Sequence, residues 1–119
     1  MVSETSDQSR ASICTGFPSR MDMESRFAMQ QFWSTVRPYA KVRMLGSAAA
    51  SLLHVANGSA DVYSEKSIML WDVAAGMAIV QGAGGECLKK QVASQEWAYE
   101  VFASNPALLS YYQEEDGPH

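Results

Sequence analysis

A single acid, Asp72, interrupts the start of the apolar run over residues 70–80. The run predicts a helix that begins at Asp72 and ends among the glycines of residues 82–85. A carboxylate in that position either accepts hydrogen bonds from backbone N–H groups as an N-cap or faces a ligand at the positive end of the helix. Because Asp72 is itself an anion, the natural ligand is a cation, and the two interpretations are compatible.

Two further groups of residues could share a site with Asp72. Gly46, Ser47 and Ala48 lie between a predicted strand and a predicted helix. Backbone N–H groups at such a helix start can bind a hydroxyl or a phosphate, although small residues there can equally form a tight turn. Glu65 falls in a predicted loop, where it is either solvated or converges with Asp72 on a pocket for a polyol or a metal.

The other candidates for chemistry favour structural roles. His54 stands among apolar residues of a predicted helix, with no partner at metal-ligand spacing. Cys14 and Cys87 also lack that spacing and are expected to be reduced thiols in the core. Trp71 is expected to pack and to anchor the turn before the Asp72 helix. Ser51 has no His and Asp partners that would make it a nucleophile.

Strands and helices alternate along the chain, which predicts an α/β layered domain with a mixed or parallel sheet flanked by helices. Strands are predicted at residues 11–17, 41–45, 60–63, 86–90 and 100–103, and a loop at residues 64–70. Four helices are predicted. The first follows Asp22, and the second runs from its N-cap Ser47 to Asn57-Gly58. The third begins at Asp72, and the fourth follows Asn105-Pro106. The first helix has a regularly spaced apolar face that is expected to be buried, formed by Phe27, Ala28, Met29, Phe32, Trp33 and Val36.

Composition narrows the class of protein. The 119 residues suit one domain, expected at residues 11–112 between a disordered lead-in at 1–10 and a frayed acidic tail at 113–119. The net charge of -4 and the scattered Lys and Arg argue against a nucleic-acid surface. No apolar run reaches the roughly 20 residues that span a bilayer, and the polar N-terminus does not resemble a signal peptide. A cytoplasmic protein is therefore expected.

From about Lys41 to Gly85 the chain resembles the inositol monophosphatase family of magnesium-dependent phosphatases. The matching blocks keep the order of the family and include Arg43, Gly46–Ala49, Val55–Gly58, Ala60–Tyr63, Glu65, Trp71–Gly76 and Ala83–Gly85. The resemblance implies the smaller, C-terminal α/β domain of such an enzyme. It also implies that Asp72 contacts a catalytic Mg²⁺ and the substrate. Glu65 would bind substrate hydroxyls, and Gly46, Ser47 and Ala48 would line the substrate site.

Two sequence blocks of the family are absent. Its other metal ligands lie on an N-terminal domain, in a Gly-Glu-x-x-x-x-Asp block and an Asp-Pro-x-Asp-Gly-Thr block, and neither occurs here. Asp72, even with Glu65, cannot supply the near-octahedral oxygen shell of Mg²⁺. No catalytic set is complete in this sequence.

Two hypotheses follow from this departure. In the first, the chain is the substrate-side domain of a phosphomonoesterase for inositol, sugar or nucleotide phosphates. It would be inactive alone, and its partner would be an N-terminal metal-binding domain or a second chain. In the second, it is a non-catalytic interaction domain that retains the fold. In both, an exposed apolar face would favour homo-oligomers.

Overall fold

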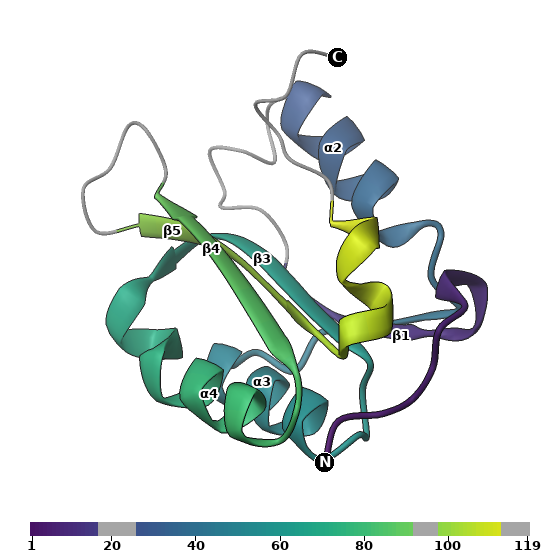
Figure 1. Ribbon diagram of the computed structural model, residues 1–119. Helices are drawn as coiled ribbons and strands as arrows, with labels where there is room; N and C mark the ends of the chain where they lie inside the picture. The colour runs from purple at the N-terminus through teal and green to yellow at the C-terminus, as the bar shows by residue number, and fades with distance from the viewer. Residues whose placement is uncertain (17–25, 92–97, 113–119) are drawn as a thin grey trace.

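The computed structural model describes residues 1–16, 26–91 and 98–112, and its central element is a five-stranded sheet (Figure 1). The strands lie in the order β2 (Lys41–Arg43), β1 (Ser12–Cys14), β3 (Val62–Met69), β5 (Ala98–Ser104) and β4 (Glu86–Gln91). β1 is parallel to both β2 and β3, whereas β5 is antiparallel to β3 and β4. The expected α/β fold with a mixed sheet and flanking helices is confirmed.

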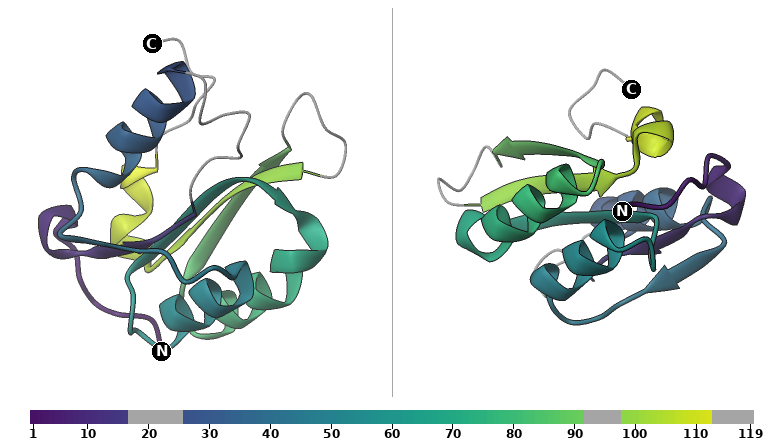
Figure 2. Two further views of the ribbon diagram at one scale, coloured as in Figure 1. Left: turned by 180° about the vertical axis from the view of Figure 1, so that it is seen from behind. Right: turned by 60° about the horizontal axis from the view of Figure 1, so that its bottom comes forward.

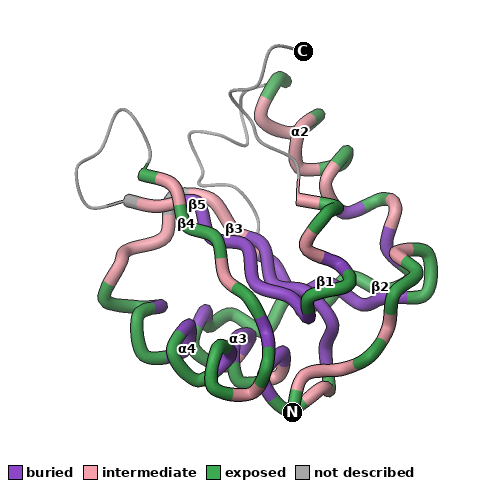
Figure 3. The backbone as a smooth tube through the Cα atoms, in the orientation of Figure 1, coloured by how far each residue is buried: buried purple, intermediate pink, exposed green. Residues whose placement is uncertain are grey.

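Helices cover both faces of the sheet (Figure 2). Helices α3 (Ala48–Ala56) and α4 (Leu70–Gly82) pack on one face, and α2 (Arg26–Val36) and the 3₁₀ helix η2 (Pro106–Tyr111) lie on the other. Side chains alternate along each strand, so β1 and β3 send Cys14 and Tyr63 toward α3 and α4 and their neighbours Ile13 and Val62 toward α2. Figure 3 shows the buried strands between these two layers.

The predicted limits of α3 are confirmed. Ser47 is the N-cap, and its hydroxyl oxygen accepts a hydrogen bond from the Ala50 N–H at 3.2 Å. The helix ends at Ala56 with Asn57 as its C-cap, and Gly58 follows with a φ of +82°, which a residue without a Cβ adopts without strain.

The start of α4 differs from the prediction. The helix begins at Leu70, its N-cap residue is Met69, and Asp72 lies within the first turn, so Asp72 is not the N-cap. The segment expected as a loop at residues 64–70 instead continues β3 as far as Met69, opposite Ala98 of β5. Pairing with β5 therefore outweighs the low strand propensity of the polar residues in this segment.

The first ten residues also differ from the prediction of a disordered lead-in. The Val2 N–H donates to the Ala83 carbonyl at 3.1 Å, and the Ser3 hydroxyl donates to Asp61. The Asn105 side-chain amide donates to the Thr5 carbonyl at 2.8 Å. These bonds join the segment to three residues that are distant in sequence and lie at the ends of helices and strands.

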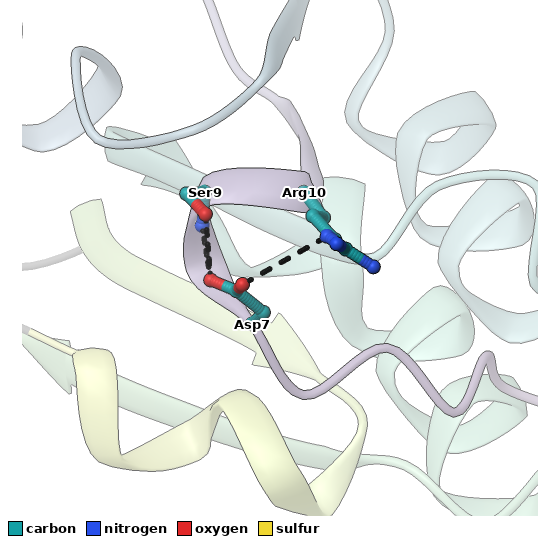
Figure 4. Close-up of polar contacts among 3 residues, drawn as sticks. All are labelled: Asp7, Ser9 and Arg10. Carbon is teal, nitrogen blue, oxygen red and sulfur yellow. Dashed lines mark hydrogen bonds and ion pairs between the residues drawn. The ribbon is translucent and has the colours of Figure 1, made fainter.

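A short 3₁₀ helix, η1 (Gln8–Arg10), follows this segment and is capped by Asp7 (Figure 4). The Asp7 carboxylate accepts hydrogen bonds from the Ser9 N–H at 3.0 Å and the Ser9 hydroxyl at 2.7 Å. These bonds from Ser9 lower the pKa of the Asp7 carboxyl, and Arg10 forms an exposed ion pair with it at 4.0 Å.

The apolar face predicted for α2 is not buried as a whole. Val36 is buried, but Phe27 and Trp33 are each 62% exposed. Only the C-terminal end of the helix reaches the core, where Val36 packs in the cluster that contains Ile13 and Val62. The periodicity identified a helix correctly but did not show how much of it would be covered.

The remaining expectations differ in detail. The first two strands are shorter than predicted and end at Cys14 and Arg43, whereas β4 and β5 include the predicted segments. Asn105 caps η2 with Pro106 in its first turn, as predicted. Asp22 and the tail from residue 113 lie outside the described residues.

Two chain-wide properties were also expected. Both cysteines are free thiols, with Cys14 buried and Cys87 half-buried. In the described parts of the chain, none of the helices has the length and apolar character needed to cross a bilayer.

Candidate functional site

A cavity of about 620 Å³ opens where α3 and α4 begin, beside the carboxyl end of β1. Its walls contain all five residues that the sequence singled out, together with six others: Thr15, Gly16, Met44, Gly46, Ser47, Ala48, Ala49, Ser51, Glu65, Ile68 and Asp72. In sheets with parallel strands, ligands bind outside the carboxyl ends of those strands. The predicted residues are therefore brought together at a position where this kind of fold binds ligands.

The turn before α3 forms one wall of the cavity. Gly46 has a φ of +75°, a conformation that favours glycine, and a Cβ there would meet no other atom within 4 Å. Glycine is therefore required at this position by the backbone conformation and not by lack of space. The Ser47 oxygen caps α3, so its O–H remains a possible donor toward the cavity. This geometry is that of a tight turn, and it leaves helix N–H groups facing the cavity.

Glu65 lines the cavity from the middle of β3. The Tyr63 hydroxyl donates to Glu65 Oε1 at 3.0 Å. A Cβ added at Gly16 would lie 2.8 Å from Glu65 Oε2, so glycine at this position leaves room for the carboxylate. Burial raises the pKa of the Glu65 carboxyl, and the hydrogen bond from Tyr63 partly opposes that increase.

Asp72 is exposed on the first turn of α4, where the helix dipole favours a negative charge. Its carboxylate also influences Tyr63. The pKa of the Tyr63 hydroxyl is raised, mainly by burial, then by the charge on Glu65, and further by the charge on Asp72. The buried phenol therefore lies in the electrostatic field of both acids that line the cavity.

The cavity fits Mg²⁺ only in part. Asp72 and Glu65 provide carboxylate oxygens, the ligand type that Mg²⁺ prefers. Across residues 1–16, 26–91 and 98–112, no three His, Cys, Asp or Glu side chains are grouped so that they could hold a metal ion. Asp72 is thus suitable as one ligand of a shell that needs further oxygen atoms.

Sequence reasoning missed several residues of the site. Tyr63 was not recognised as the partner of Glu65, and Gly16 was placed only within the strand predicted at residues 11–17. The Thr15 hydroxyl donates to the Ser64 carbonyl at 2.6 Å and joins the end of β1 to β3 beside the cavity. A glycine directly after a short apolar strand was the available signal, because that position is the carboxyl end of a parallel strand.

The structural role expected for Trp71 is wrong, whereas the one expected for His54 is confirmed. Trp71 was expected to pack and anchor the turn, but it is 66% exposed. Because α4 starts two residues earlier than expected, Trp71 lies on the outer surface of the first turn. His54 is half-buried, and its Nδ1 lies 2.8 Å from the Ala50 carbonyl, which agrees with a structural role.

Comparison with known proteins identifies relatives of the chain. The model of the inositol monophosphatase family matches residues 1–108. Phosphatase IMPL1, chloroplastic, from Arabidopsis thaliana is 40% identical over 84 residues, which cover 71% of this chain and 23% of that protein. Human inositol monophosphatase 2 is 34% identical over 89 residues, which cover 71% of this chain and 30% of that protein.

Solved structures agree with these relatives. The inositol monophosphatase of Anabaena matches with a TM-score of 0.74 and 30% identity, over 90% of this chain and 43% of that one. SuhB of Mycobacterium tuberculosis matches with a TM-score of 0.75 and 31% identity, over 92% of this chain and 42% of that one. The chain spans less than half the length of each of these relatives. With a family match over most of its residues and the same fold, the chain belongs to the inositol monophosphatase family.

Proposed function

We propose that this chain forms the substrate-side domain of a Mg²⁺-dependent phosphomonoesterase that hydrolyses inositol, sugar or nucleotide phosphates. The observation that carries the proposal is the shared cavity, because it unites Asp72, Glu65 and the turn at Gly46–Ala48. Membership of the family supports the reaction class. The free thiols of Cys14 and Cys87 are compatible with a reducing compartment such as the cytoplasm.

Each wall of the cavity is assigned a part of the substrate. Asp72 would hold the metal and the phosphate close to the start of α4, and N–H groups at the start of α3 would bind phosphate oxygens. Glu65, as a carboxylate, would accept hydrogen bonds from hydroxyls of the leaving alcohol. Mg²⁺, when bound, would polarise the phosphate and activate a water molecule.

The proposal includes a partner. The missing oxygen ligands of the metal would come from a metal-binding domain or from a second chain, and the 119 residues alone would be inactive. The exposed aromatic side chains of Trp71, Phe27 and Trp33 are available to contact such a partner. They equally favour an alternative, a non-catalytic interaction domain that retains the fold. Phosphate release after mixing with the metal-binding half of a relative would distinguish the two.

The test uses Mg²⁺ and the chain as it is. We expect millimolar binding in a titration followed by NMR, with shifts in the backbone signals of the first turn of α4. Asp72→Asn should remove these shifts because a neutral amide is a much weaker ligand for Mg²⁺. Glu86→Gln, which changes an exposed acid on β4, serves as the matched control and should leave them intact.

Two outcomes would contradict the proposal. An unchanged Mg²⁺ response in Asp72→Asn would remove Asp72 from the metal site. Steady release of phosphate from inositol 1-phosphate by the pure chain with Mg²⁺ would show that no partner is needed.

A further inference from the structure

We propose that Lys66 and Gln31, on the α2 side of the sheet, are positioning residues for Asp72, which lies on the α4 side. They act through a β-bulge in β3, whose shape sets the place of the first turn of α4. The inference rests on the proposed function, in which Asp72 holds the metal. It adds to that function two residues that do not line the cavity.

The bulge lies between Glu65 and Ile68 of β3. Glu65 pairs with Val101 of β5 and Ile68 pairs with Tyr99, so three steps along β3 correspond to two along β5 and β3 contains one extra residue. The side chains show the same irregularity. Glu65 and Ile68 both line the cavity, although strict alternation would send residues three apart to opposite faces. A bulge of this kind bends its strand and increases the local twist.

The bend is passed directly to α4. Because β3 ends at Met69 and α4 begins at Leu70, no loop between them can absorb a change in the direction of the strand (Figure 1). Further along the helix, packing on α3 holds α4 in place, since Met77 belongs to the same buried cluster as Leu52. The bulge therefore fits the direction of β3 to the position of α4. The first turn, which carries Asp72, is the part of the helix that depends on this fit.

A hydrogen bond on the other side of the sheet holds the bulge. Lys66 lies within it, and the Lys66 Nζ donates to Gln31 Oε1 of α2 at 3.0 Å. The Lys66 side chain also lines a small cavity of about 20 Å³ on the α2 side. Directly before the bulge, the Ser64 carbonyl accepts a hydrogen bond from the Thr15 hydroxyl at 2.6 Å. Side chains thus tie β3 to α2 at the bulge and to β1 next to it.

The first experiment records backbone carbon-13 shifts of the 119-residue chain, without metal and during a Mg²⁺ titration. Gln31→Leu removes the acceptor of the hydrogen bond without changing any charge. The Cα shifts of residues 70–73 should move toward those of an unfolded chain. Mg²⁺ binding at this turn should weaken about threefold, at the lower end of the factors expected for loss of one hydrogen bond. Gln30→Leu, the same change at an exposed neighbour on α2, is the matched control and should alter neither.

A second pair of variants changes Lys66. Loss of a positive charge by itself favours the binding of a cation, so Lys66→Met would bind Mg²⁺ more tightly if Lys66 acted only through its charge. We expect the reverse, a weakening similar to that of Gln31→Leu. Lys66→Arg keeps a donor for Gln31 and should bind Mg²⁺ like the original chain. Tighter binding in Lys66→Met, or an equal weakening in Lys66→Arg, would overturn the positioning role.

Deletion of Ser67 tests the bulge itself. The deletion leaves equal numbers of residues on β3 and β5 between the two flanking pairs, so the strands can pair regularly while the bend is lost. The first turn of α4 should then lose its helical Cα shifts and its Mg²⁺ response, whereas the signals of residues 76–82 should remain. A deletion variant that keeps both properties of the first turn would refute the inference. Should the deletion unfold the chain, Gln31→Leu, which leaves the length of β3 unchanged, decides the question.

These outcomes separate the inference from the proposed function. If the original chain shows no Mg²⁺ response, the proposed function fails, and the Cα shifts without metal still decide whether Gln31 positions the first turn. If the Mg²⁺ response is present and disappears in Asp72→Asn, while Gln31→Leu equals the original chain in both measurements, only the further inference fails.

Discussion

The two acids of the cavity are held in different ways. Asp72 is exposed and stabilised by the start of a helix, whereas Glu65 is half-buried, accepts a hydrogen bond from Tyr63 and lies against Gly16. Exposure allows Asp72 to meet a cation and its water molecules. Burial gives Glu65 a defined direction at a cost in desolvation. The difference matches the division of tasks proposed for them.

Replacement of Glu65 by Gln should reveal this cost. Burial raises the pKa of the carboxyl above its ordinary value of 4.5, so the folded chain binds the proton more tightly than the unfolded chain. The free energy of unfolding therefore falls as the pH rises from the ordinary value through the raised one. We expect Glu65→Gln to lack this fall and to be more stable than the original chain at neutral pH.

Urea unfolding over a series of pH values measures this effect. The two proteins should have similar stability below pH 4.5, where the carboxyl is protonated in both the folded and unfolded states. Glu86→Gln, at an exposed position, should follow the pH dependence of the original chain. The same pH dependence in Glu65→Gln would show that burial does not disfavour the charged form.

At the residue scale, the sequence identified the two acidic residues but not the residues that contact Glu65 and hold it in place. Asp72 and Glu65 could be selected because carboxylates near predicted element ends are few. The roles of Tyr63 and Gly16 depend on the approach of β1 to β3, residues about fifty positions apart, which no local pattern records. The exposure of Trp71 followed from the start of α4, and this start was misplaced by two residues.

At the scale of elements, strand pairing determined where the site was built. β3 continues through its polar residues because β5 pairs with it up to Met69, with an irregularity between Glu65 and Ile68. This extension carries Glu65 into the cavity and delivers the chain directly to Leu70, where α4 begins. Local propensity predicted α3, whose ends have clear capping residues. It could not predict a strand that depends on a distant partner.

The contact between α3 and α4 gives a prediction at this scale. A Cβ at Gly76 would lie 2.8 Å from Leu52 Cβ, whereas a Cβ at Gly82 would meet nothing within 4 Å. Gly76→Ala should therefore destabilise the fold by about 1–3 kcal/mol through overpacking, despite the better helix propensity of alanine. Gly82→Ala should stabilise it by up to about 1 kcal/mol.

Urea unfolding of both variants tests the close approach of these helices. Because the two substitutions are identical and lie in the same helix, their difference reports the contact with Leu52 and not the propensity of alanine. A stabilised Gly76→Ala would mean that α3 and α4 are not in close contact at this position.

At the scale of the whole molecule, large apolar side chains remain on the surface. Phe27 and Trp33 on α2, Val42 on β2 and Trp71 on α4 are all more than two-fifths exposed. The edge strand β2 is short and has Lys41 and Arg43 beside Val42, which discourages pairing with another sheet. Association through exposed side chains is therefore favoured over extension of the sheet.

We expect reversible self-association of the chain when no partner is present. The average mass measured by light scattering should increase with concentration, because apolar surface is removed from water when copies associate. Trp71→Ser, on the exposed surface of the first turn of α4, should reduce the association. Ile79→Ser, which replaces an exposed apolar residue further along α4, is the control. A constant monomeric mass at high concentration would contradict the expectation.

The contacts of the first two residues determine where a fusion partner at the N-terminus would lie. Met1 lies against Gly58, and Val2 is bonded to Ala83, so the chain starts where α3 and α4 end. The cavity lies at the opposite ends of these helices. With nine residues in α3 and a rise of about 1.5 Å per residue, roughly 13 Å of helix separates the two. An affinity tag or a fluorescent protein fused before Met1 would thus emerge at the rear of the domain and leave the mouth of the cavity open to small molecules.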